Sequence, residues 1–187
     1  FGQLLNRLKQ NGFNDICGAD IDEQALEVSS KFHKVYDCRE IGWDNELTNS
    51  FDLIIMSHVL EHFPKDEMIS RLIQIRTLLK DNGKIVIMVP NAQSNTGAYW
   101  AYEDFTHHYL FTSGSIYYVL KAAGFSKIDF IDVDCTAGLK PTKRVVKRIL
   151  LSLYKINFNF WNRITTSYFH RPSPQVFSYE IKICAKK

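Results

Sequence analysis

The sequence lacks several features that would assign it to a particular class of protein. Among its 187 residues, no apolar run approaches the roughly 20 residues needed to span a bilayer. No CxxC pair occurs among its cysteines, which argues against a disulfide framework or a zinc site. The amphipathic opening FGQLLNRLKQ is unlike a signal peptide. We therefore expect a cytoplasmic protein with a single domain over residues 1–187.

Acidic residues are missing from a long segment near the end of the chain. No Asp or Glu lies between Cys135 and Tyr179, whereas this segment holds eight of the twenty-three basic residues. The other fifteen basic residues stand against all twenty acidic ones, so the rest of the chain is mildly acidic. Charge segregation of this kind indicates a surface with a charged partner.

A basic amphipathic helix is predicted within this segment, from about Lys143 to Tyr154, with aromatic residues after it. We predict that residues 138–175 form a basic, aromatic helical insertion. Its apolar face could pack on the domain, join two copies in a homodimer through residues 143–169, or lie peripherally on the inner face of an anionic membrane. Nucleic acid is the least favoured partner.

Helices and strands are expected to alternate along the remaining chain. The runs 51–57 and 84–90 are apolar without alternation, which is typical of strands buried on both faces. The last strand, 177–186, follows another strand without a regular crossover and is expected to run antiparallel. This order predicts a Rossmann-like, doubly wound α/β fold with a mostly parallel sheet. Helices are expected near 3–10, 22–30, 64–79 and 112–122, and further strands near 14–20, 33–37 and 127–134.

Polar residues follow the predicted strands at their carboxyl ends, where ligands bind in open α/β sheets. An acid at the place of Asp20 can accept two hydrogen bonds from a ribose diol, although a helix cap is an alternative role. The residues at these strand ends are Asp20 with Ile21, Asp37 with Cys38, and Ser57 with His58.

These segments, in this order, resemble the class I methyltransferases that use S-adenosylmethionine. GADIDEQAL is similar to the strand after the family's cofactor loop, and FDLIIMSHVLEHF to its fourth strand. LLKDNGKIVIMVPN and HHYLFTSGSIYYVLKAAGF resemble later segments, so the likeness extends over about residues 1–132. The resemblance implies an enzyme that transfers a methyl group from S-adenosylmethionine, its cofactor.

The resemblance also implies which residues contact that cofactor. Asp20 with Ile21 would contact the ribose, Asp37 with Cys38 the adenine, and Gly2 the methionine portion. Ser57 and His58 would form the floor near the reactive centre. One departure is the glycine-rich loop, G-x-G-x-G, which is absent as a whole. We interpret Gly2 as its last glycine and expect a longer natural protein, with a preceding first strand.

The methyl acceptor is expected to be a small molecule, by analogy with bacterial enzymes of glycan, quinone and lipid pathways. We predict O-methylation of a sugar, a quinone or a lipid-linked precursor. His107, and after it His108, could act as a general base, or could anchor their loop. A non-catalytic binding or scaffolding module of the same fold is the rival hypothesis.

No metal site is predicted. His58, Glu61 and His62 spell the zinc motif H-x-x-E-H. That motif requires both histidines on one helical face, whereas His58 is expected at a strand end and Pro64 follows His62 closely. Hydrogen bonds that shape a loop are the alternative role of Glu61 and His62.

Overall fold

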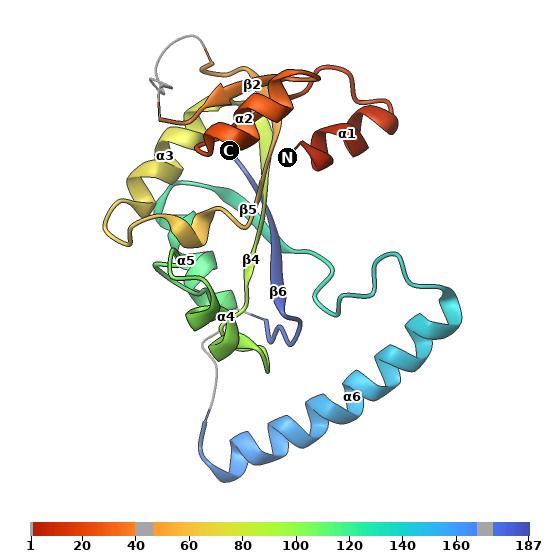
Figure 1. Ribbon diagram of the computed structural model, residues 1–187. Helices are drawn as coiled ribbons and strands as arrows, with labels where there is room; N and C mark the ends of the chain where they lie inside the picture. The colour runs from red at the N-terminus through yellow and green to blue at the C-terminus, as the bar shows by residue number, and fades with distance from the viewer. Residues whose placement is uncertain (1, 40–46, 168–173) are drawn as a thin grey trace. The chain divides into compact units, whose positions relative to one another are not determined.

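The computed structural model describes residues 2–39, 47–167 and 174–187. The chain divides into two compact units, residues 1–46 and 47–187. Unit 1 contains α1 (Gln3–Gln10), β1 (Cys17–Asp20), α2 (Glu23–Ser30) and β2 (Lys34–Asp37) (Figure 1). Its two strands pair in parallel. The predicted start of α2 is confirmed, because the Asp22 carboxylate accepts a hydrogen bond from the Ala25 amide at 2.7 Å.

Unit 2 is built on a four-stranded sheet in the order β3-β4-β6-β5. Its strands are β3 (Phe51–Ser57), β4 (Leu79–Pro90), β5 (Ser126–Phe130) and β6 (Glu180–Lys186). β3 and β4 are parallel, and β6 runs antiparallel to both β4 and β5. The predicted antiparallel last strand and the α/β fold are therefore confirmed.

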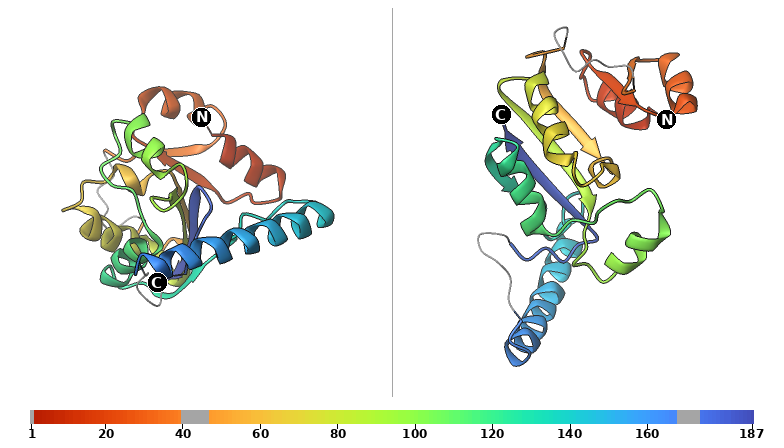
Figure 2. Two further views of the ribbon diagram at one scale, coloured as in Figure 1. Left: turned by 90° about the horizontal axis from the view of Figure 1, so that it is seen from below. Right: turned by 90° about the vertical axis from the view of Figure 1, so that its left-hand side faces the viewer.

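Two helices cover one face of this sheet and bury its apolar residues. α3 (Met68–Leu78) and α5 (Ser113–Ala122) lie side by side in front of the strands in the right-hand view of Figure 2. α5 begins where a helix was predicted, and the side chain of Thr112 caps it in a reciprocal arrangement with Ser115. The core of unit 2 includes the fully buried Leu72, Ile85, Ile87, Val89, Phe111, Ile116, Leu120, Ile181 and Ile183.

The prediction that strand 51–57 is buried on both faces is wrong. Within β3 only Met56 is buried, and Leu53 is 47% exposed. The reason is its position, because β3 is an edge strand of the four-stranded sheet. The run of apolar residues correctly indicated a strand, but it did not indicate the position of that strand in the sheet.

Three local elements differ from the prediction. Residues 91–110, where no helix or strand was predicted, contain α4 (Gly97–Glu103). A short 3-10 helix, η1 (Leu60–His62), follows β3. The basic helix α6 (Pro141–Ile164) is 24 residues long, twice the predicted span, and lies within residues 138–175. No helix among the described residues has the length and apolar character to cross a membrane.

Candidate functional site

Asp20 ends β1 in unit 1, and the main chain fixes its carboxylate. Oδ1 accepts hydrogen bonds from the amides of Ile21 (2.8 Å) and Asp22 (3.1 Å). The residue is exposed, and no hydrogen bond from a described residue reaches Oδ2. One oxygen is therefore held in place by two amides while the other is open to a ligand hydroxyl.

Asp37 and Cys38, at the end of β2, are already engaged within unit 1. Arg39 donates from Nη2 to Asp37 Oδ2 at 2.6 Å and from Nε to Oδ1 at 3.0 Å, which lowers the pKa of Asp37. The Cys38 amide donates to the Asp20 carbonyl at 2.8 Å, and burial raises the pKa of the Cys38 thiol. The adenine contact of these residues stays a prediction, and the Arg39 guanidinium is the group that an adenine amine would displace from Asp37.

Gly2 precedes α1 with a φ of 68°, in the left-handed region that favours glycine. A Cβ at this position would also lie 3.2 Å from Ser29 Oγ. No described side chain caps α1, and its first turn holds no acidic residue. The amides at the start of α1 are therefore available to an anion, as expected if Gly2 contacts the carboxylate end of a ligand.

His58 follows β3 in unit 2 and lies between two buried acids. Its Nδ1 is 3.3 Å from Glu61 Oε1, and its Nε2 is 3.1 Å from Glu180 Oε1. The Glu61 contact is the largest of the influences that raise the pKa of His58, and burial opposes them. His58 has a φ of 53°, which is uncommon outside glycine and frequent at functional sites. Ser57, beside it, ends β3 and is exposed.

Glu180 is a site residue that the sequence alone did not reveal. It begins β6, 122 residues after His58, and pairs with Pro90 across the sheet. Its second oxygen lies 3.6 Å from Lys182 Nζ. The only signal in the sequence is an acid inside a strand of alternating apolar residues, which is unusual for a residue that becomes buried.

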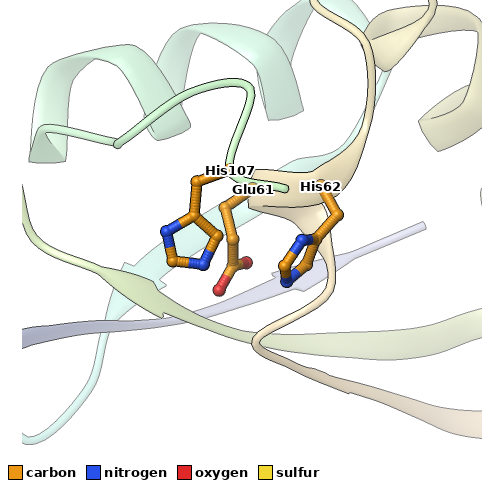
Figure 3. A group of neighbouring side chains, drawn as sticks. All are labelled: Glu61, His62 and His107. Carbon is orange, nitrogen blue, oxygen red and sulfur yellow. The ribbon is translucent and has the colours of Figure 1, made fainter. Parts of the chain in front are cut away.

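A second cluster lies beside His58 and joins η1 to the loop after α4. Glu61, His62 and His107 each offer one nitrogen or oxygen atom, and these atoms lie within 4.8 Å of one another. Figure 3 shows the Glu61 carboxylate between the two imidazole rings. Glu61 is fully buried, and neither of its carboxylate oxygens accepts a hydrogen bond from a described residue. Its Oε1 has only the ion-pair contact with His58, whose geometry is not that of a hydrogen bond.

The loop that carries His107 is attached to η1 through the main chain. The amides of His108 and Tyr109 both donate to the Glu61 carbonyl, at 2.9 and 3.3 Å. His107 is largely buried, and its Nδ1 donates to the Trp100 carbonyl at 2.9 Å. The His108 side chain is exposed. The two candidates for a general base therefore differ in burial, His107 being largely buried and His108 exposed. A catalytic role for either of them stays a prediction.

Solved structures similar to this chain have the fold of methyltransferases. A SAM-dependent methyltransferase from Archaeoglobus fulgidus is 22% identical, with a TM-score of 0.67 over 100% of this chain and 81% of that chain. One from Mesorhizobium loti is 12% identical, with a TM-score of 0.59 over 100% and 86% of the two chains.

A third similar structure, from Burkholderia thailandensis, is 1,6-didemethyltoxoflavin-N1-methyltransferase with bound 1,6-didemethyltoxoflavin and S-adenosylhomocysteine. It is 14% identical, with a TM-score of 0.55 over 100% of this chain and 66% of that chain. No functionally curated protein matches the chain.

The profile of a family described as "Methyltransferase domain" matches residues 2–129, more than half of the sequence. The chain therefore belongs to this methyltransferase family. The predicted class, a methyltransferase with a Rossmann-like fold, is confirmed.

Proposed function

We propose that this enzyme transfers the methyl group of S-adenosylmethionine to an oxygen of a small-molecule acceptor, in the class of sugars, quinones or lipid-linked precursors. Asp20 and the start of α1 would hold S-adenosylmethionine, which would supply an electrophilic methyl group on its sulfonium to an aligned acceptor oxygen. Sulfur would keep the electron pair of the carbon–sulfur bond, and the proton of the acceptor hydroxyl would pass to a base or to solvent. Such a transfer depends mainly on alignment of the two reactants.

The observation that supports cofactor binding best is the carboxylate of Asp20. Its Oδ1 is fixed by the Ile21 and Asp22 amides, so Oδ2 has a defined direction before any ligand arrives. A preorganised acceptor loses little entropy when it binds a hydroxyl. The uncapped start of α1 behind Gly2 supports an anion contact in the same unit.

The test is calorimetric titration of the protein, as its gene encodes it, with S-adenosylhomocysteine. Asp20→Asn keeps the oxygen that accepts from the two amides and replaces the charged acceptor at Oδ2 by a donor. We expect binding to weaken about tenfold or more, the usual value of a hydrogen bond to a charged group. Asp15→Asn, an exposed acid before β1, is the matched control and should bind like the parent. Absence of binding by the parent would contradict the proposal and favour a non-catalytic module.

A second proposal concerns the partner of α6, whose apolar side is turned to solvent. The side facing the rest of unit 2 is partly polar, since Lys147 Nζ donates to the Cys135 carbonyl at 2.6 Å and Lys155 Nζ to Asp134 Oδ1 at 2.8 Å. Phe158 on the same side packs edge-on against Phe177, with ring centroids 5.0 Å apart. The opposite side carries apolar residues that are each 56–67% exposed: Val145, Val146, Ile149, Leu150, Leu153, Ile156, Phe160, Trp161 and Ile164.

Charge decides between the partners that such a face could take. α6 carries six basic residues and no acidic one. Two copies of this helix would repel each other, whereas an anionic lipid surface attracts it while its apolar residues enter the interface. We therefore propose that α6 places the enzyme peripherally on an anionic membrane, at its cytoplasmic face, close to a lipid-linked acceptor.

Flotation with vesicles of phosphatidylcholine, with and without phosphatidylserine, tests this proposal. We expect the protein to float with the anionic vesicles at low salt. Leu153→Glu should abolish flotation, whereas Ser152→Glu introduces the same charge one residue away, at the edge of the apolar face, and should weaken it less. Failure to float, together with a dimer that Leu153→Glu dissociates in analytical ultracentrifugation, would identify a homodimer instead.

A further inference from the structure

In the cluster of Glu61, His62 and His107, a carboxylate and two imidazole nitrogens lie close together, and each of these three groups is a hydrogen-bond acceptor. The protonation of His62 follows from its neighbours. The Thr106 hydroxyl has a single proton, which it donates to Asp104 Oδ1 at 2.6 Å. The same hydroxyl lies 2.8 Å from His62 Nδ1, so Nδ1 must be the donor in that contact. In the tautomer that this contact selects, Nε2 of His62 carries the lone pair.

His107 follows the same reasoning. Its Nδ1 lies 2.9 Å from the Trp100 carbonyl, which can only accept, so the proton is on Nδ1. Nε2 of His107 is left with its lone pair, 3.7 Å from Asp104 Oδ2 and beyond hydrogen-bond distance from it. Both histidines therefore direct an acceptor nitrogen toward the buried carboxylate of Glu61, and none of the three groups supplies a proton to the others.

Burial makes this arrangement costly without a cation. Glu61 is 0% exposed, and its oxygens accept no hydrogen bond from the described residues. A carboxylate in that state pays most of its desolvation cost unless a positive charge meets it. His58 approaches only Oε1, through Nδ1, while its Nε2 contacts Glu180. Glu61 Oε2 and the Nε2 atoms of His62 and His107 contact no positively charged group among the described residues.

We propose that Glu61, His62 and His107 form a binding site for a divalent transition-metal cation, with Zn²⁺ as the preferred ion. Two imidazoles and one carboxylate are a ligand set that zinc uses in proteins with a further position open to water or substrate. Each imidazole also has its other nitrogen bonded to an oxygen acceptor, the arrangement that orients histidine ligands at metal sites.

Metal binding would tighten the cluster. Bonds of about 2.0–2.1 Å in a tetrahedral site place ligand atoms roughly 3.3 Å apart, compared with the limit of 4.8 Å in this structure. Mg²⁺ and Ca²⁺ prefer oxygen ligands and are not expected to bind. This site differs from the H-x-x-E-H pattern in the sequence, because His107 replaces His58 as the second imidazole. The proposal reverses the sequence-based prediction of no metal, and it does not depend on cofactor binding.

The experiment uses protein that has been stripped with a chelator and titrated with Zn²⁺ alone in a calorimeter. We expect one ion per chain and a melting temperature that rises by about 5–10 °C when zinc exceeds its Kd a hundredfold. His62→Asn and His107→Asn should each weaken binding about a hundredfold or more, because even outer-shell partners are worth 10–100-fold. His108→Asn, the exposed neighbour, is the matched control and should bind like the parent.

Co²⁺ provides an independent readout of the ligands. A visible spectrum without thiolate charge-transfer bands is expected, because no cysteine belongs to the cluster. Glu61→Gln keeps the size of the buried side chain, and circular dichroism checks that it folds. Absence of zinc binding by the parent, equal binding by the parent and both histidine variants, or thiolate bands in the cobalt spectrum would each overturn the proposal.

Discussion

Replacement of Asn91 by alanine should destabilise unit 2 more than any other change to a neutral polar residue after β4. Asn91 is fully buried. Its Nδ2 donates to the carbonyls of Val176 and Ser178, both at 2.8 Å, and its Oδ1 accepts from the Gln93 amide at 3.0 Å. One side chain thus connects the end of β4 to the segment that leads into β6, 85 residues later.

The magnitude follows from these three hydrogen bonds. Each is worth about 1 kcal/mol net, so Asn91→Ala should cost about 3 kcal/mol. For a chain of this size that corresponds to a melting temperature lower by about 6–12 °C. Urea unfolding followed by tryptophan fluorescence would measure it as a lower midpoint at unchanged slope.

The matched control is Asn95→Ala in the same loop. Asn95 is exposed and accepts one hydrogen bond, from the Tyr154 hydroxyl at 3.1 Å. Its loss should change the free energy of unfolding by less than about 0.5 kcal/mol. A cost at Asn91 below about 1 kcal/mol, or one equal to that of Asn95→Ala, would refute the reasoning that the buried amide holds the two segments together.

Two further predictions concern pH and packing. Burial is the largest influence on the Asp132 carboxyl and raises its pKa, but hydrogen bonds from Ala137, Lys182 and Thr136 together lower it. A depressed pKa contributes stability that is present above about pH 4 and lost as pH falls through the folded value. Asp132→Asn should therefore flatten the acid limb of a stability–pH curve, and exposed Asp129→Asn should not; an unchanged limb in Asp132→Asn would contradict this. Gly97→Ala would place a Cβ 2.4 Å from the Ala92 carbonyl oxygen and should cost about 1–3 kcal/mol in urea unfolding. Gly12→Ala, where no atom lies within 4 Å, tests the left-handed backbone alone, and an equal or larger cost there would contradict the packing argument.

The sequence predicted the elements whose signals are local. Asp22 and Thr112 are capping residues that act within three positions, and both predicted helix starts are confirmed. The length of α6 was underestimated because its apolar and polar positions continue past Tyr154 into an aromatic stretch that was interpreted as a separate feature. α4 was missed for a related reason, since GAYWAYE has neither a capping side chain nor a polar face.

From the sequence, site residues could be predicted only where they directly follow a strand. Asp20 lies at the end of β1, where the pattern placed it. The contact of His58 with Glu180, 122 positions later in the chain, depends on the register of β6 against β4. Sequence periodicity sets which face a strand residue occupies but not the strand beside it, so no local pattern could reveal this contact.

The meeting of His107 with Glu61 and His62 is determined by the main chain. The His108 and Tyr109 amides donate to the Glu61 carbonyl, so the loop stays attached to η1 when a side-chain contact of the cluster, such as that of His62 Nδ1 with Thr106 Oγ1, is lost. Replacement of an imidazole should therefore leave this main-chain attachment in place. This separation makes zinc affinity a specific readout: a loss of binding at unchanged folding stability identifies a ligand, whereas a parallel loss of both would mean that the histidines serve only to hold the loop.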